Sequence, residues 1–165
     1  MDKSHLSMLP AELRNFIYEL VLKESEPIKI REKRRSLVSV PVWRPPALLQ
    51  SCRAIRQEAS CLYFALNTFE VQCHLHPDWT HLTQEEANRF LRAWLASLTL
   101  EDRKSVRKIR LNDIMHGPAT AEVRADGCRA MMKGLGMDPM GVEIFLEVNA
   151  SVCATHGGVY KWTCV

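Results

Sequence analysis

The sequence has no long hydrophobic run, and this absence excludes several classes of protein. No stretch approaches the roughly 18 consecutive apolar residues of a membrane-spanning helix, and the N-terminal MDKSHLSMLP has no apolar signal core. Internal repeats, low-complexity tracts and long linkers are absent as well. We therefore expect a cytoplasmic or nuclear protein that has no membrane partner and folds as one domain over residues 1–165.

The sequence motifs of common enzymes are also missing. There is no GxSxG nucleophile motif, no HExxH zinc motif and no glycine-rich phosphate loop. The six cysteines form no CxxC pair, which is typical of reduced thiols in an intracellular protein. Cys52 and Cys61 have no histidine three or four residues away that could act as a base. The sequence predicts a non-enzymatic protein without catalytic residues, metal or cofactor.

One cluster of metal-ligand residue types does occur. It contains Cys73, His74, His76 and His81, and a structural Zn²⁺ usually takes four such ligands. A strand would send Cys73 and His74 to opposite faces, and Pro77 interrupts the segment. We interpret this cluster as a surface loop without a metal ion.

A strong excess of one charge is absent from the chain as a whole. The 22 Lys and Arg residues against 19 Asp and Glu residues leave a formal net charge of +3, which gives no overall nucleic-acid footprint. One local basic segment contains Arg31, Lys33, Arg34 and Arg35. Two interpretations stay open for it: a surface that binds nucleic acid or another polyanion, and the solvated tip of a hairpin.

Regular apolar patterns are what the sequence does have. Apolar residues three and four positions apart predict helices over residues 10–23, 46–66, 83–98 and 121–135. Alternating patterns predict a hairpin over 28–42, single strands over 69–74 and 106–112, and a last hairpin over 142–165. The segment TLEDRKS is expected to be a polar turn. The chain ends in the strand-like VYKWTCV, which fits a piece of a longer protein.

These elements predict an α+β fold. We expect three or four helices packed on a small, mostly antiparallel sheet, with an N-terminal helix and a β-hairpin at the start. Pro41 cannot donate a hydrogen bond to a neighbouring strand, so its strand should lie at an edge of the sheet.

Two blocks of sequence resemble a known family. They are LPAELRNFIYELVL, which begins at Leu9, and PALLQSCRAIRQEASCLYFALNTFEV, which begins at Pro46. The first resembles the opening of F-box domains, and the pair looks like a set of uncharacterised fungal intracellular proteins labelled F-box-like. This resemblance implies a protein-interaction module that recruits substrates to a cullin-RING ubiquitin ligase by binding its Skp-type adaptor. The implied contact positions are Leu9, Pro10, Leu13, Ile17 and Leu20.

The apolar stripe of the first helix has two interpretations. An exposed stripe on a rigid helix would fit the groove of a partner. Stripes at helical spacing more often complete the core of their own domain, and we expect this for most of these side chains.

Polar residues on the first two predicted helices could face one another. They form either ion pairs between the helices or a recognition surface, and the sequence does not separate these two roles. The residues are Arg14, Asn15, Glu19, Arg53, Arg56 and Glu58.

Overall fold

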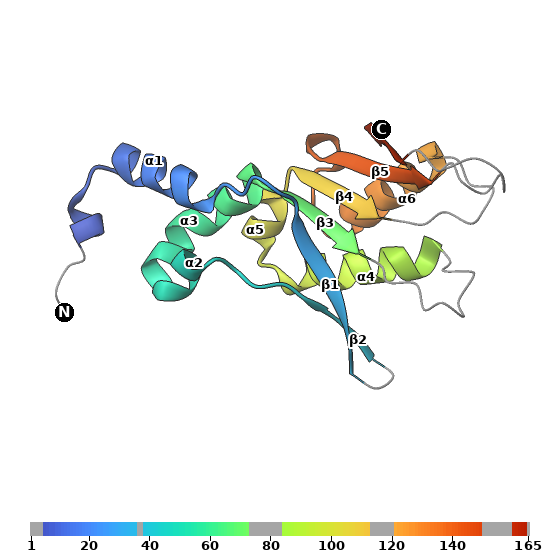
Figure 1. Ribbon diagram of the computed structural model, residues 1–165, viewed down its shortest axis with the longest axis horizontal. Helices are drawn as coiled ribbons and strands as arrows, with labels where there is room; N and C mark the ends of the chain where they lie inside the picture. The colour runs from blue at the N-terminus through green and yellow to red at the C-terminus, as the bar shows by residue number, and fades with distance from the viewer. Residues whose placement is uncertain (1–4, 36–37, 73–83, 113–120, 150–159, 165) are drawn as a thin grey trace.

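The computed structural model describes residues 5–35, 38–72, 84–112, 121–149 and 160–164 (Figure 1). The elements follow the order η1 (His5–Met8), α1 (Ala11–Leu22), β1 (Ile28–Arg35), β2 (Val38–Val42), α2 (Ala47–Ser51), α3 (Arg53–Leu66), β3 (Thr68–Gln72), α4 (Gln84–Ser97), α5 (Leu100–Ser105), β4 (Lys108–Asn112), α6 (Ala121–Gly134), η2 (Pro139–Gly141), β5 (Glu143–Asn149) and β6 (Tyr160–Cys164). The described residues therefore contain six α-helices, two more than the upper number expected from the sequence.

The strands form one sheet in the order β2-β1-β3-β4-β5-β6. The predicted α+β class is confirmed, but the prediction of a mostly antiparallel sheet is wrong. The three central pairings, β1 with β3, β3 with β4 and β4 with β5, are parallel, and only the two outer pairings are antiparallel. Helices lie between the central strands along the chain, and such crossover connections join parallel strands.

The hydrophobic core lies between one face of the sheet and the helices. Because β1, β3, β4 and β5 are adjacent in chain order, crossovers of one hand place the intervening helices on the same side (Figure 1). Phe69, Ile109 and Ile144 are paired across β3, β4 and β5, and all three are fully buried. The ring of Phe69 lies 5.2 Å from that of Trp94 on α4, which joins the sheet to the helical layer.

Both predicted hairpin pairings are confirmed. Strand β1 pairs with β2 in antiparallel register from Arg31 opposite Val42 to Arg35 opposite Val38. Strand β2 lies at the edge of the sheet, as expected from Pro41. Strands β5 and β6 are antiparallel as well, and residues 150–159 between them lie outside the described residues.

The helix predicted over residues 46–66 is two helices, because the chain is extended at Cys52. The backbone there has φ −154° and ψ 163°, which ends α2 and begins α3. The Cys52 sulfur accepts a hydrogen bond from the backbone N–H of Ile55 at 3.5 Å and so caps α3. The Arg56 side chain donates from Nε to the Leu49 carbonyl at 2.8 Å and holds the two helices together.

The segment TLEDRKS, predicted as a turn, forms α5 instead. Thr99 caps the helix, because its hydroxyl oxygen accepts a hydrogen bond from the backbone N–H of Asp102 at 3.1 Å. The Thr99 hydroxyl also donates to the Asp102 carboxylate at 2.7 Å. A threonine three residues before an acidic residue was the signal in the sequence for this helix start.

Candidate partner-binding site

The outer face of α1 is apolar and exposed. Leu13, Phe16, Leu20 and Val21 have exposed fractions of 51%, 58%, 67% and 55%. We call these four residues the α1 ridge. Large apolar side chains that gather on one exposed surface usually mark a site of contact with another molecule.

The inner face of α1 packs against α3 through different residues. Tyr18 and Leu22 are 1% and 0% exposed, and Arg14 is half-buried on the same side. With 3.6 residues per turn, Phe16 and Leu20 lie on the side of the helix opposite Tyr18. The expectation that most side chains of the predicted stripe complete the core is therefore wrong, because Leu13, Phe16, Leu20 and Val21 are exposed.

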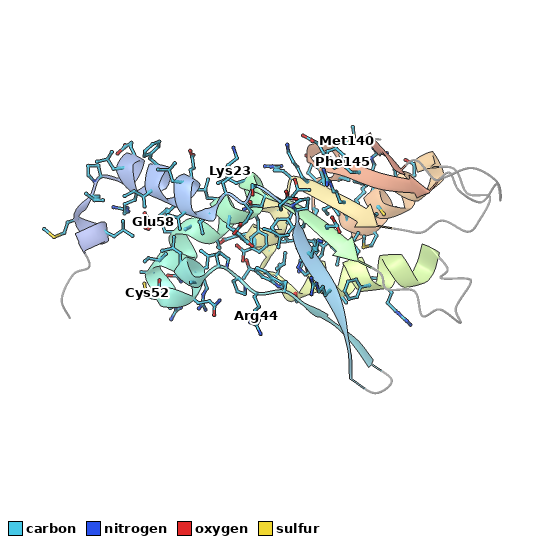
Figure 2. All side chains as sticks on the ribbon, viewed as in Figure 1. Lys23, Arg44, Cys52, Glu58, Met140 and Phe145 are labelled. Carbon is cyan, nitrogen blue, oxygen red and sulfur yellow. The ribbon has the colours of Figure 1, made fainter. Side chains whose placement is uncertain are left out.

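An ion pair fixes the first half of α1 on α3. Arg14 Nη2 and Glu58 Oε1 form a salt bridge with a distance of 2.6 Å. Arg14 Nε donates a hydrogen bond to the same Glu58 oxygen at 2.7 Å. Tyr18 donates its hydroxyl to the other Glu58 oxygen at 3.0 Å, and Figure 2 shows Glu58 between α1 and α3. Of the two roles that the sequence left open for the polar residues of these helices, ion pairing is observed for Arg14 and Glu58.

This polar cluster shifts the ionisation of its members. The hydrogen bond from Arg14 lowers the pKa of Glu58 below its ordinary value, and the bond from Tyr18 acts in the same direction. Burial raises the pKa of Tyr18, and its hydrogen bond to the Glu58 carboxylate raises it further. At neutral pH the cluster therefore contains an ionised carboxylate, a guanidinium ion and a neutral phenol.

The Leu9-Pro10 step is held by the same arginine. Arg14 Nη1 donates to the Leu9 carbonyl at 2.6 Å, and the Leu9 N–H donates to the Leu6 carbonyl at 3.2 Å. Pro10 is exposed and occupies the N-cap position of α1, while Leu9 is half-buried. Arg14 thus orients both α1 and the segment that leads into it.

A buried asparagine fixes the other end of α1. Asn67 is 2% exposed, and its amide nitrogen donates to the carbonyls of Leu22 and Tyr63 at 2.8 and 2.9 Å. Its side-chain oxygen accepts a hydrogen bond from the Glu24 N–H at 2.8 Å. The helix predicted over residues 46–66 ends just before Asn67, and this role of its side chain was not predicted. The signal was a polar residue placed between two strongly apolar segments, because a buried amide needs partners for its donors and acceptor.

The other predicted site residues differ in how far they are exposed to solvent. Ile17 is half-buried, so Leu13, Leu20 and Pro10 are the exposed members of the five implied contact positions. Arg31 of the basic segment is exposed, and the side chains of Lys33, Arg34 and Arg35 lie outside the described part of the chain. The cluster at residues 73–81 lies outside it too, so its interpretation as a loop stays a prediction.

Within the residues that the structure describes, no group of three or more His, Cys, Asp or Glu side chains could hold a metal ion. In the same part of the chain, no helix combines the length and the apolar character needed to cross a membrane. Cys52, Cys61 and Cys128 are thiols rather than disulfides.

Comparison with protein-family models, with curated proteins and with solved structures gives no match. The assignment of a function to this chain therefore depends on the geometry of α1 and its ridge.

Proposed function

We propose that this chain is a non-enzymatic protein-interaction module, an F-box-like subunit that recruits substrates to a cullin-RING ubiquitin ligase. In this proposal α1 binds the Skp-type adaptor through Leu13, Ile17 and Leu20, together with the preceding Leu9-Pro10 step. The observation that carries it is the exposed ridge on a helix whose inner face is fixed to α3.

Burial of the α1 ridge against a partner has a lower free energy than its exposure to solvent. Full burial of a leucine or phenylalanine side chain contributes about 1.5 to 3 kcal/mol, and the four ridge residues are each about half exposed or more. A partner that covers them would gain several kcal/mol in total. Hydrogen bonds from Arg14 near the start of α1 and to the Leu22 carbonyl at its end already order the helix, so less entropy is lost on binding than for a mobile segment.

The mode of binding would be a helix in a groove. In such complexes one face of an amphipathic helix supplies apolar anchors at spacings of three, four and seven residues. Leu13, Phe16 and Leu20 have these spacings on the outer side of α1. A few such central anchors usually account for most of the binding energy.

A pull-down with the Skp-type adaptor tests the proposal. We expect wild-type protein to bind at micromolar concentration, and Leu13→Asp and Leu20→Asp each to weaken binding at least about tenfold, or 1.4 kcal/mol. Both residues are exposed, so the variants should stay folded. Asn15→Asp is the matched control, because it adds the same charge to an exposed position of α1 away from the ridge. Absence of wild-type binding, or equal loss in the control, would contradict the proposal.

A further inference from the structure

One face of the sheet is not covered by any described helix. Along β1, Ile30 is buried against the helical layer, whereas its neighbours Lys29 and Arg31 are exposed on the opposite face. On β4, Ile109 is buried and its neighbours Lys108 and Arg110 are only half-buried. Parallel strands are usually covered on both faces, so the parallel centre of this sheet has room for a partner.

Charged residues occupy this open face in a fixed register. Lys29 lies opposite Glu70, Glu70 opposite Arg110, and Arg110 opposite Phe145, so these residues form one row across four strands. The guanidinium carbon of Arg110 lies 5.9 Å from the centre of the Phe145 ring. Glu70 is only 8% exposed between the two cations that flank it in the register. The row is therefore an ordered surface with positive charge on both sides of a buried carboxylate.

The neighbouring row contains a weaker pair. Lys108 lies opposite Glu143, with 3.8 Å between the ammonium nitrogen and the carboxylate oxygen. Among the described side chains of this face, four are cations and two are carboxylates, an excess of two positive charges. The cations are Lys29, Arg31, Lys108 and Arg110, and the carboxylates are Glu70 and Glu143.

We propose that this open sheet face binds an acidic peptide segment of a substrate protein. The inference rests on the proposed function, in which a surface other than the α1 ridge must hold the substrate. The exposed cations lie on β1 and the half-buried ones on β4, with β3 between them. Strands spaced about 4.8 Å apart place these two groups roughly 10 Å from each other, a span that two acidic side chains of one extended peptide can bridge. The exposed Arg31 can bind a carboxylate through two hydrogen bonds.

The same observations disfavour a nucleic acid on this face. A continuous phosphate backbone that crosses from β1 to β5 would pass Glu70 and Glu143, which repel it. Single-strand binders also stack bases on open aromatic rings. On β1, β3, β4 and β5 the described aromatic side chain of this face is Phe145, which is half-buried with Arg110 over its ring. Separate carboxylates fit the alternating charges of the face better than an unbroken polyanion does.

Fluorescence anisotropy tests the inference at low ionic strength. The probe is a short fluorescein-labelled peptide that alternates glutamate and serine, and the comparison ligands are the same peptide with glutamine and a single-stranded oligouridylate of equal charge. We expect the glutamate peptide to bind best, and the double variant Lys29→Glu/Arg31→Glu to weaken its binding at least about tenfold. The control is Lys104→Glu/Lys133→Glu, which makes the same change of charge at exposed helical positions and should alter binding about twofold or less.

Three results would overturn the inference: no binding of the glutamate peptide by wild type, equal weakening by both double variants, or tighter binding of the oligouridylate through Lys29 and Arg31. The adaptor pull-down on the same variants separates this inference from the proposed function. Lys29→Glu/Arg31→Glu should still bind the adaptor, because neither residue lies on α1.

Discussion

At the scale of single residues, two polar side chains determine how α1 is held. Glu58 accepts hydrogen bonds from both Arg14 and Tyr18, and Asn67 joins the ends of α1 and α3. Neither residue contributes to the apolar pattern from which helices are predicted. The hydrogen bonds of Glu58 and Asn67 determine which face of α1 packs inward and which face stays exposed.

The lowered pKa of Glu58 predicts a dependence of stability on pH. A carboxyl group whose pKa is lower in the folded state stabilises the fold above its unfolded pKa, and this contribution is lost as pH falls through the folded pKa. We expect the free energy of unfolding of wild type to fall more than that of Glu58→Gln when the pH is lowered below the ordinary Glu value of 4.5. Urea unfolding of both proteins at neutral and acid pH measures this difference. Parallel pH profiles would contradict the role assigned to Glu58.

The buried amide of Asn67 predicts a larger loss of stability. Asn67→Ala removes the partners of the Leu22 and Tyr63 carbonyls and of the Glu24 N–H. An unsatisfied buried polar group costs about 1 to 3 kcal/mol, so we expect a total loss of roughly 2 to 4 kcal/mol in the free energy of unfolding. Chemical denaturation measures the loss, with the exposed Asn15→Ala as the control at roughly 0.5 kcal/mol or less. Equal effects of the two variants would contradict this account.

At the scale of elements, the two faces of α1 should respond differently to substitution. Phe16→Gln removes an exposed ring and should change the free energy of unfolding by about 0.5 kcal/mol or less. Tyr18→Ala leaves a cavity and an unpaired Glu58 oxygen, so it should cost about 3 kcal/mol or more. Thermal and urea unfolding of the two variants test this contrast. A large loss for Phe16→Gln would mean that the ridge belongs to the core.

The sequence predicts the existence of most elements and is weaker on their orientation. Helix α1, helix α4 and helix α6 lie within one residue of their predicted bounds, because periodic apolar residues are a local signal. The inward face of α1 was not predicted, because the sequence offered pairing of Arg14 with the distant Glu58 only as one of two open roles. The break at Cys52 was missed because the apolar pattern continues across it.

At the scale of the whole molecule, the direction of the strands was the largest error. The sequence offers helices between β3 and β4 and between β4 and β5, an order that is typical of parallel strands. The two predicted hairpins suggested a mostly antiparallel sheet, but these hairpins form only the two edges of the sheet. The open sheet face follows from this topology, because consecutive crossovers place the helices on one side only.

The proposed function assigns two surfaces to two partners. The α1 ridge is apolar and fixed by α3, whereas the open sheet face is charged and formed by β1, β3, β4 and β5. A subunit that recruits substrates needs two such separate surfaces, one for the adaptor and one for the substrate. Variants of one surface should therefore leave the binding of the other partner unchanged.

Calorimetric titration of the chain with the Skp-type adaptor measures directly whether the α1 ridge binds it. We expect a dissociation constant in the micromolar range or below for wild type, and at least about tenfold weaker binding for Leu20→Asp. Asn15→Asp should bind as wild type does. No heat of binding with wild-type protein, or equal affinity of wild type and Leu20→Asp, would contradict the claim that the α1 ridge binds this adaptor.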